Sequence, residues 1–383
     1  MSSKQVEFGI IGAGNTGVGS SRGDSFIRLL KVFSDQARVT AICDISEENA
    51  QRAAEYADGA KAFTDLERFL DSGVEAVVVA TPVRVHAEQS VTALERGIHV
   101  LSEVPAAHTL EAAGALAEAA RRSKAVYMFG ENIRYLDEIE LVKRMAADGR
   151  FGEPYYAEGE YVHDCKDLWQ AADGSATWRG EQHGKAPGYG VYCTHSLGPA
   201  LYLLEDRVVQ VSALANEQSL VAPGRKGLFN FTMLMRTAKG RVVKVRVDTV
   251  SPRPHGASYF GLQGTKGCYE SQRGFGDEPK VWLADEHEES HVFNSARWHR
   301  LWDYAARYIP DRLRVGEEAR QGGHGTCEHW MMKDFLSAIR GEQPPAIDVY
   351  RGLDYTVPGI CALESMERAG AAVLVPDFRM ETK

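Results

Sequence analysis

Two side chains that can move protons lie three residues apart near the middle of the chain. The segment GYGVYCTHSLGP, residues 188–199, contains Tyr192 and His195. Residues i and i+3 of a helix share a face, so the phenol and the imidazole would point in one direction. The pair predicts a site that removes a proton from a hydroxyl group. The alternative is that both side chains only fill an interface between domains. We expect Cys193, between them, to be a small buried residue rather than a nucleophile.

Four further proton-transfer or binding candidates come from two other segments. Tyr161 and His163 lie two residues apart in EYVHD, so they share one face of a strand. Asp164 would face the other way unless the strand has already ended. Glu131 directly follows an apolar strand, where it could accept a proton or bind a ribose. The alternatives are a core or interface position for Tyr161 and a cap on the next segment for Glu131.

Loop residues supply candidates for binding a substrate. A tryptophan can stack on a flat ring, and an arginine can bind a carboxylate in bidentate fashion. Each candidate taken alone is more often structural or solvated. If several arginines converge, the substrate would carry a carboxylate or sulfonate. The loop candidates are Trp178, Arg179, His183, Arg253, His255 and His324.

A glycine-rich turn near the N-terminus predicts a dinucleotide site. GIIGAGNTG places Gly12-x-Gly14-x-x-Gly17 between an apolar strand and a helix. The glycines allow a tight turn and close approach of a pyrophosphate to the helix N-terminus. A second strand ends in Asp44, 27 residues after Gly17, where a carboxylate binds ribose hydroxyls and disfavours a 2′-phosphate. We therefore expect NAD rather than NADP; the alternative is a glycine turn with a capping Asp44.

The turn is longer than usual, because VGSSRGD follows Gly17 before the helix pattern starts. We expect the helix to begin near Asp24 and Arg22 to reach the phosphates. Asn15 and Thr16, inside the glycine motif, belong to the same predicted cofactor site.

Strands and helices alternate through the first 130 residues. Continuous apolar strands separated by amphipathic helices predict a parallel sheet covered on both faces. Ligands of such sheets bind beyond the carboxyl ends of the strands. The expected strands cover 6–14, 38–44, 74–82, 98–105 and 125–132, and the expected helices cover 24–34, 46–57, 84–97 and 109–123. The strand ends that should cluster are Gly12, Asp44, Thr81, Glu103 and Glu131.

The second half of the chain is richer in strands joined by short turns, which predicts a largely antiparallel open sheet with helices on one side. The fold class is therefore an α/β domain, residues 1–130, followed by an α+β domain, residues 131–383, for substrate binding and oligomerisation. Its expected strands cover 154–164, 208–216, 227–237, 241–251, 257–265 and 266–272, its helices 192–205, 325–340 and 348–370, and its loops 216–227, 272–295 and 310–324. We expect 348–370 to pack back on the first domain.

Composition narrows the function classes. The chain has 383 residues, a formal net charge of −9 and no basic patch interleaved with aromatics, so nucleic acid is not an expected partner. No apolar run is long enough to span a membrane and no signal-peptide pattern opens the chain, so we expect a cytoplasmic location. Six dispersed cysteines without C-x-x-C spacing indicate reduced thiols and no metal site.

With these residues in hand, the chain resembles the Gfo/Idh/MocA oxidoreductase family over nearly its whole length. The likeness rests on the glycine turn, ATPVRVHAE (80–88) and GIHVLSEVPAA (97–107). It implies a Rossmann domain, a sugar-like substrate between the domains, and homodimers or homotetramers packed through the C-terminal sheet. The implied NAD(P) contacts outside the turn are Ala80, Thr81, Pro82, His86 and Glu103, to which we add Asn132, Trp178 and Arg179. Glu103, His163 and Asp164 are also expected at the substrate.

Two departures point to a narrower resemblance. The family's usual Glu-Lys-Pro is Glu103-Val104-Pro105, and Val191 replaces an aspartate four residues before the histidine. The segments 192–199, 130–132, 160–164 and 322–350 instead resemble NAD-dependent glycoside hydrolases of the family 109 type. That resemblance implies four catalytic residues: Glu131, Tyr161, Tyr192 and His195.

The same resemblance implies a mechanism in which NAD stays bound. The C3 hydroxyl is oxidised, the C2 proton becomes acidic, the aglycone leaves, water adds, and the ketone is reduced back. Two alternatives stay open: a glycoside 3-dehydrogenase that releases the keto sugar, and a non-catalytic NAD-binding regulator.

Overall fold

The computed structural model describes residues 4–14, 21–170, 173–183, 192–221, 228–253, 259–286 and 297–379, with the side chains of 178, 182 and 183 outside that description. The N-terminal half forms a six-stranded parallel sheet, sheet A, in the order β3-β2-β1-β4-β5-β6. Its inner strands are buried on both faces, as their continuous apolar sequences predict. The strands are β1 (Val6–Ile11), β2 (Ala37–Cys43), β3 (Lys61–Phe63), β4 (Ala76–Val79), β5 (His99–Ser102) and β6 (Tyr127–Phe129).

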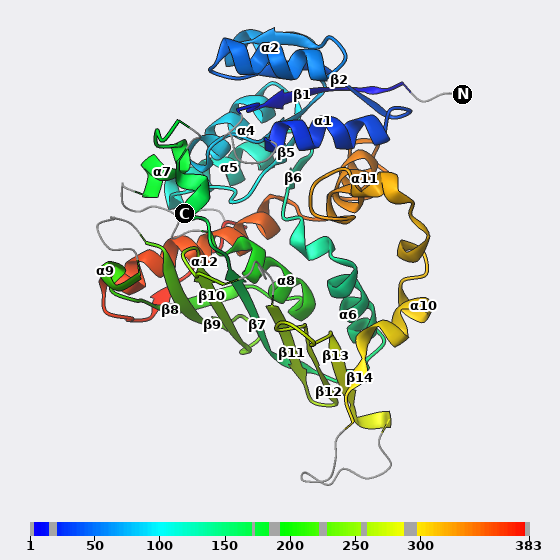
Figure 1. The fold of residues 1–383 in the computed structure, drawn as a ribbon, viewed down its shortest axis with the longest axis vertical. Helices are drawn as coiled ribbons and strands as arrows, with labels where there is room; N and C mark the ends of the chain where they lie inside the picture. The colour runs from blue at the N-terminus through cyan, green and yellow to red at the C-terminus, as the bar shows by residue number, and fades with distance from the viewer. Residues whose placement is uncertain are drawn as a thin grey trace.

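Five helices surround sheet A (Figure 1). The first begins at Arg22, two residues before the expected Asp24, because the Ser21 hydroxyl caps it by accepting a hydrogen bond from the Asp24 amide at 3.0 Å. β3 and α3 were not predicted, because both are short and their apolar residues show little periodicity. The helices are α1 (Arg22–Val32), α2 (Glu47–Tyr56), α3 (Leu66–Leu70), α4 (His86–Glu95) and α5 (Leu110–Arg122).

The C-terminal half forms a nine-stranded sheet, sheet B, in the order β14-β13-β12-β11-β7-β10-β9-β8-β15. Its pairs are antiparallel except for β7 with β10. The predicted fold class is confirmed, but the loop expected over 272–295 is wrong because it contains β13. The strands are β7 (Pro154–Val162), β8 (Val208–Ala215), β9 (Asn230–Thr237), β10 (Val242–Asp248), β11 (Tyr259–Gly264), β12 (Gly267–Glu270), β13 (Lys280–Leu283), β14 (His299–Arg300) and β15 (Val373–Leu374).

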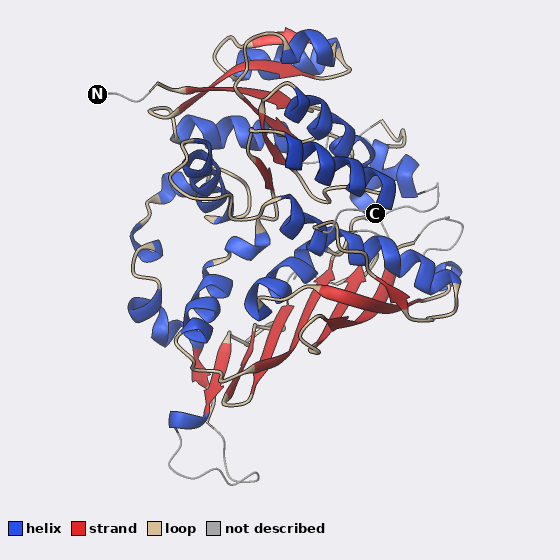
Figure 2. Cartoon of the chain, turned by 180° about the vertical axis from the view of Figure 1, so that it is seen from behind, coloured by secondary structure: helices blue, strands red, loops and turns tan. Residues whose placement is uncertain are grey.

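Helices cover one face of sheet B and lie between the two sheets (Figure 2). α8 packs so closely on β7 that a Cβ on Gly159 would lie 2.3 Å from the Ser196 carbonyl oxygen. α12 contacts β8 on one side and β6 and α5 on the other. α6 was not predicted. The helices of the C-terminal half are α6 (Asp137–Ala147), α7 (Trp178–His183), α8 (Thr194–Leu204), α9 (Gln218–Val221), α10 (Ala305–Tyr308), α11 (Cys327–Ile339) and α12 (Val349–Glu367).

The described residues offer neither a membrane-spanning helix nor a metal-binding cluster. None of the described helices combines the length and the apolar character that crossing a bilayer requires. In the same part of the chain, no three or more His, Cys, Asp or Glu side chains are grouped so that they could hold a metal ion.

Candidate active site

The carboxyl edge of sheet A has the shape that a dinucleotide requires. Gly12 has a φ of +96°, and a Cβ there would lie 2.7 Å from the Ala80 carbonyl oxygen, so only glycine fits this turn. Among the described residues, a Cβ on Gly14 would meet nothing nearer than the Asn49 amide and the Asp44 carboxylate, both at 3.8 Å. The expected neighbours Asn15, Thr16 and Gly17 lie outside the described residues.

Asp44 is held at this edge by the backbone. Its Oδ2 accepts a hydrogen bond from the Ala13 amide at 2.8 Å, and its Oδ1 accepts one from the Ser46 amide at 2.9 Å. Each carboxylate oxygen retains a second lone pair that can accept a ribose hydroxyl. These residues therefore fit NAD, although the ribose contact itself stays a prediction.

The loops after β4 and β5 are tied together by His86. Its Nδ1 lies 2.9 Å from the Pro105 carbonyl oxygen and its Nε2 lies 2.6 Å from the Thr81 carbonyl oxygen. The ring is buried, and the Thr81 hydroxyl donates to Gln89 at 2.6 Å. The expectation that His86 itself contacts the cofactor is not supported, because both ring nitrogens face backbone carbonyls. His86 instead fixes the loop that contains Ala80, Thr81 and Pro82.

Tyr192, His195 and Glu131 form a continuous series of hydrogen-bonding groups. The Tyr192 hydroxyl lies 3.1 Å from His195 Nε2, and His195 Nδ1 lies 2.9 Å from Glu131 Oε1. Glu131 is fully buried after β6, where its Oε1 also accepts the Ile133 amide at 3.0 Å. A phenol, an imidazole and a buried carboxylate in this order can pass a proton and stabilise the imidazolium that results.

The electrostatics of this series raise the proton affinity of the imidazole. Burial lowers the pKa of His195, but the adjacent Glu131 carboxylate raises it by charge and by its hydrogen bond, and Glu103 adds a smaller effect in the same direction. The net result is a pKa above the usual value. His195 can therefore accept and hold a proton that arrives through Tyr192.

The helix predicted from residue 192 begins later than expected. α8 starts at Thr194, so Tyr192 precedes its first turn, and the phenol meets the imidazole from the loop rather than from one helix face. Cys193 is buried, as expected, and burial raises the pKa of its thiol to about 12, which makes it a poor nucleophile.

Tyr161 joins the same group from β7. Its ring centroid lies 5.5 Å from that of His195, 5.7 Å from that of Tyr192 and 5.9 Å from that of His163. The expected substrate role of Asp164 is not supported, because β7 ends at Val162 and the Asp164 carboxylate pairs with the Lys166 amide and ammonium at 3.1 and 3.0 Å.

One segment of the loop candidates is a helix, because Trp178–His183 form α7. Arg179 lies on α7 and is half-buried, whereas Arg253 is exposed in the segment after β10. His255 and the side chains of Trp178 and His183 lie outside the described residues. The idea of an anionic substrate therefore stays a prediction.

Glu328 is a functional candidate that was not predicted from the sequence. Glu328, at the start of α11, accepts hydrogen bonds from Arg22 at 3.2 Å and from Asn132 at 3.0 Å, and its Oε1 lies 2.5 Å from His324 Nδ1. Arg22 also donates to Glu103 at 2.9 and 2.6 Å. Its predicted phosphate contact stays a prediction. The available signal was an acid four residues after His324 at a helix start.

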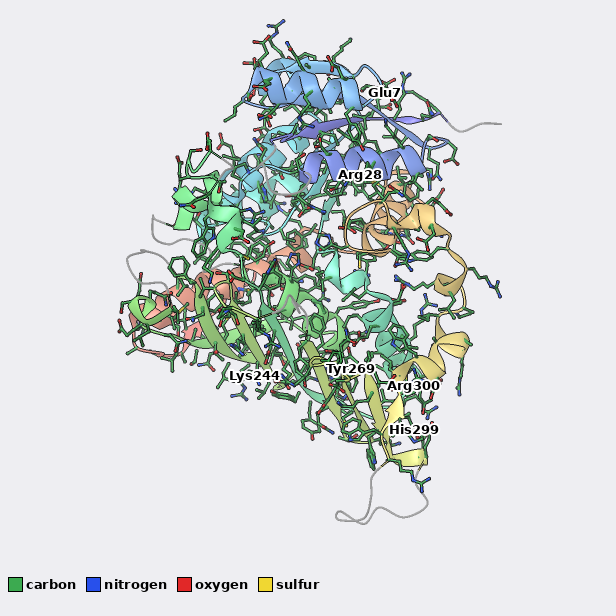
Figure 3. The ribbon with its side chains drawn as sticks, in the orientation of Figure 1. Glu7, Arg28, Lys244, Tyr269, His299 and Arg300 are labelled. Atoms are coloured by element: carbon green, nitrogen blue, oxygen red, sulfur yellow. The ribbon has the colours of Figure 1, made fainter. Side chains whose placement is uncertain are left out.

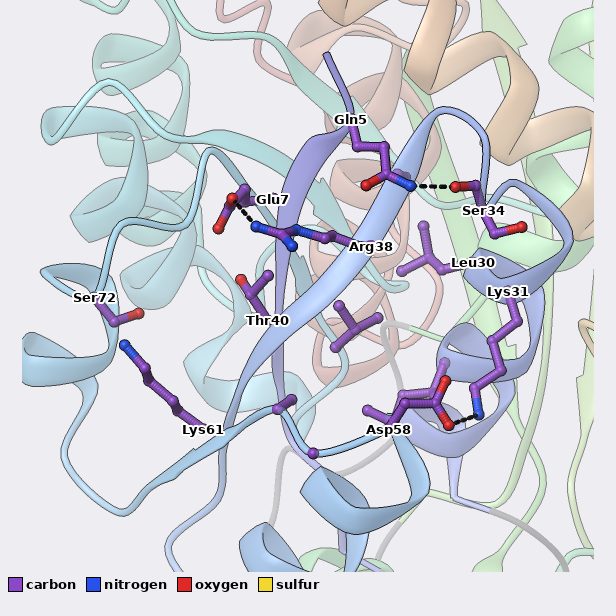
Figure 4. Close-up of a pocket in the computed structure, with 16 residues that line it drawn as sticks. Gln5, Glu7, Leu30, Lys31, Ser34, Arg38, Thr40, Asp58, Lys61 and Ser72 are labelled. Atoms are coloured by element: carbon purple, nitrogen blue, oxygen red, sulfur yellow. Dashed lines mark hydrogen bonds and ion pairs between the residues drawn. The ribbon is translucent and has the colours of Figure 1, made fainter. Parts of the chain in front are cut away.

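A cavity of about 470 Å³ lies at the opposite, amino edge of sheet A and contains none of the candidate residues (Figure 4). Ion pairs line its rim, Arg38 with Glu7 and Lys31 with Asp58 at 3.0 Å. It has no connection with the site described above.

Family models match both halves of the chain. The model described as oxidoreductase family, NAD-binding Rossmann fold, matches residues 6–131, and the GFO/IDH/MocA C-terminal domain matches residues 139–270. The model described as glycosyl hydrolase 109, C-terminal domain, matches residues 223–382.

Relatives and solved structures agree with these models. A glycosyl hydrolase family 109 protein of Shewanella pealeana is 28% identical, over 97% of this chain and 85% of its own length; one of Saccharopolyspora erythraea is 29% identical, over 97% and 83%. A levoglucosan dehydrogenase in complex with NADH and levoglucosan has the same fold, with a TM-score of 0.78 at 20% identity, over 97% of this chain and 100% of that one.

Proposed function

The chain belongs to the Gfo/Idh/MocA family of NAD-binding oxidoreductases, and from that premise we propose that it oxidises the C3 hydroxyl of a glycoside and hydrolyses the glycosidic bond without net redox change. Two observations support the proposal. The first is the series Tyr192–His195–Glu131 beside Tyr161. The second is that relatives named glycosyl hydrolase family 109 protein match 97% of the chain.

The protein's own groups would do the following work. Tyr192 takes the proton of the C3 hydroxyl and passes its own proton to His195 Nε2, whose charge Glu131 stabilises. NAD, when bound, supplies the hydride acceptor and then the hydride donor. The C3 ketone makes the C2 proton acidic. Tyr161, as its phenolate, is the candidate base that removes this proton, and the proton departs on the aglycone oxygen as the bond between C1 and that oxygen breaks. Water then adds, and the ketone is reduced as the proton returns through Tyr192.

The test is a panel of aryl glycosides incubated with the NAD-loaded protein in D₂O without added cofactor. We expect release of the aglycone, deuterium at C2 of the product sugar, and no accumulation of NADH. Tyr192→Phe is the control variant: it should still bind NADH and should lose activity by about 10²-fold or more.

Other outcomes identify the alternatives. Stoichiometric NADH with an intact glycosidic bond would replace the proposal with a glycoside 3-dehydrogenase. NADH binding without turnover of any sugar would indicate a non-catalytic regulator. Full activity of Tyr192→Phe would remove Tyr192 from the mechanism.

A further inference from the structure

A buried carboxylate from the C-terminal half ties together two side chains of the cofactor edge. Glu328 is 1% exposed, and it accepts from Arg22 Nη1 at 3.2 Å and from Asn132 Nδ2 at 3.0 Å. Arg22 is the first residue of α1, directly beyond the glycine turn, and Asn132 follows β6 next to Glu131. One carboxylate therefore orients groups from two separate elements of sheet A.

The segment that carries Glu328 is fitted against α1. The Gly322 carbonyl oxygen accepts from Arg22 at 3.3 Å, and the Gln321 carbonyl oxygen accepts from Arg28 at 3.4 Å. Figure 3 labels Arg28 on α1, beside the orange segment that leads into α11. A Cβ on Gly322 would lie 2.4 Å from the Glu328 Cβ, so the close approach needs glycine at that position.

In this cluster a single guanidinium pairs with two carboxylates. The guanidinium of Arg22 lies between two carboxylates, Glu103 at 2.6 Å and Glu328 at 3.2 Å. Glu328 also accepts a hydrogen bond from the His324 backbone amide at 3.2 Å, and its Oε1 lies 2.5 Å from His324 Nδ1. Removal of the Glu328 charge would leave Arg22 with one carboxylate and the Gly322 carbonyl, and would leave a single amide oxygen to serve both Arg22 and the buried Asn132 amide.

We propose that Glu328 is a positioning residue of the NAD site, which aims Arg22 and Asn132 at the bound dinucleotide. NAD affinity then depends on a residue some 300 positions away from the glycine turn. The proposal rests on NAD binding by the Rossmann domain and is independent of the glycoside chemistry proposed above.

The experiment measures NADH affinity of the full chain by fluorescence titration, without substrate. Glu328→Gln should weaken NADH binding at least tenfold, which is about 1.4 kcal/mol. Asp334→Asn is the matched control on the same helix: its carboxylate also accepts two hydrogen bonds, from Tyr135 at 3.0 Å and Gln343 at 3.1 Å, but it touches neither Arg22 nor Asn132. We expect the control to change the dissociation constant less than twofold.

A double-mutant cycle separates positioning from a general effect on folding. If Glu328 acts through Arg22, Glu328→Gln should weaken binding much less in an Arg22→Met background than in the wild type. Glu328→Asp, which keeps the charge, should lose less affinity than Glu328→Gln. Unchanged affinity in Glu328→Gln, equal losses in Asp334→Asn, or full additivity with Arg22→Met would each overturn the proposal.

Because no glycoside takes part, failure of these titrations leaves the glycosidase test intact. Failure of the glycosidase test likewise leaves the NADH result valid. The two proposals can therefore be rejected separately.

Discussion

At the scale of single residues, the proposed chemistry depends on a buried carboxylate. Glu131 is fully buried, and its Oε1 serves both His195 and the Ile133 amide. An unpaired buried carboxylate is costly, and the imidazolium is the cation that compensates it. The pKa of His195 therefore depends on folding, because folding places Glu131 beside the ring.

The first prediction concerns pH and Glu131→Gln. The pKa of His195 is raised in the folded protein, so its contribution to stability is fully present below the unfolded value of about 6.5 and is lost as pH rises through the folded pKa. In the variant the two effects of Glu131 are lost, so burial, which lowers the pKa, outweighs the smaller effect of Glu103. The stability gap between wild type and variant should therefore be larger at pH 5.5 than at pH 9, as measured by urea unfolding. A gap that does not change with pH would contradict the coupling.

The second prediction concerns the nucleotide preference. Asp44→Ala should weaken NADH about tenfold or more and narrow the discrimination against NADPH, because a carboxylate accepts ribose hydroxyls and repels a 2′-phosphate. Fluorescence titration with both nucleotides measures this change. Asp65→Ala is the control, since Asp65 also caps a helix by accepting the Arg68 amide at 2.8 Å. Undiminished NADH affinity in Asp44→Ala would refute the ribose contact.

At the scale of elements, the site exists because α8 lies directly on β7. The backbone contact between Gly159 and Ser196 leaves no room for a side chain. Glycine at Gly198 similarly makes space for the Glu131 side chain, since a Cβ there would lie 2.8 Å from Glu131 Cγ. This close packing brings Tyr161 of the strand against His195 of the helix.

The third prediction tests that packing. Gly159→Ala should destabilise the protein by about 1–3 kcal/mol, because its Cβ meets a backbone oxygen that cannot move alone. Gly274→Ala, where nothing lies within 4 Å, is the control and should change stability little. Thermal or urea unfolding of both variants provides the measurement. Equal stability of the two variants would show that α8 can shift away from β7.

At the scale of the whole molecule, α12 joins the two sheets. Its Thr356 hydroxyl accepts the Ala106 amide of the N-terminal half at 3.2 Å, and a Cβ on Gly352 would lie 2.8 Å from the Phe129 Cβ. The opposite face of sheet B presents exposed apolar side chains, Leu234 at 55% and Val242 at 44% exposure. This is the face through which the family resemblance implies assembly.

The fourth prediction is that the chain forms a homodimer or homotetramer through this face. Light scattering after size exclusion should give a multiple of the 42.2 kDa chain mass, and Leu234→Lys should shift the mass downward. Tyr56→Lys is the control, because Tyr56 lies on α2, in the other domain, with a similar exposure of 39%. A monomeric wild type, or an unchanged mass in Leu234→Lys, would contradict this assembly.

The sequence by itself determined the fold class and the candidate proton-transfer residues. Apolar strands, amphipathic helices and a glycine turn are local patterns, so the parallel sheet and its carboxyl edge could be predicted directly. Tyr161, Tyr192, His195 and Glu131 were also recognisable from their segments. The unpredicted elements β3, α3 and β13 are short, and a strand such as β13 forms because its neighbours pair with it. α6 is amphipathic, with Ile139, Leu141, Val142 and Met145 buried, so its pattern was present in the sequence.

Only the tertiary structure decided how these residues meet. Glu131 accepts from His195 across 64 positions, and Glu328 from Arg22 across 306. Such pairs depend on which elements pack together, because nothing in the local sequence records a contact made after a long loop closes. The same holds for His86, whose ring faces the carbonyls of Thr81 and Pro105 from separate loops.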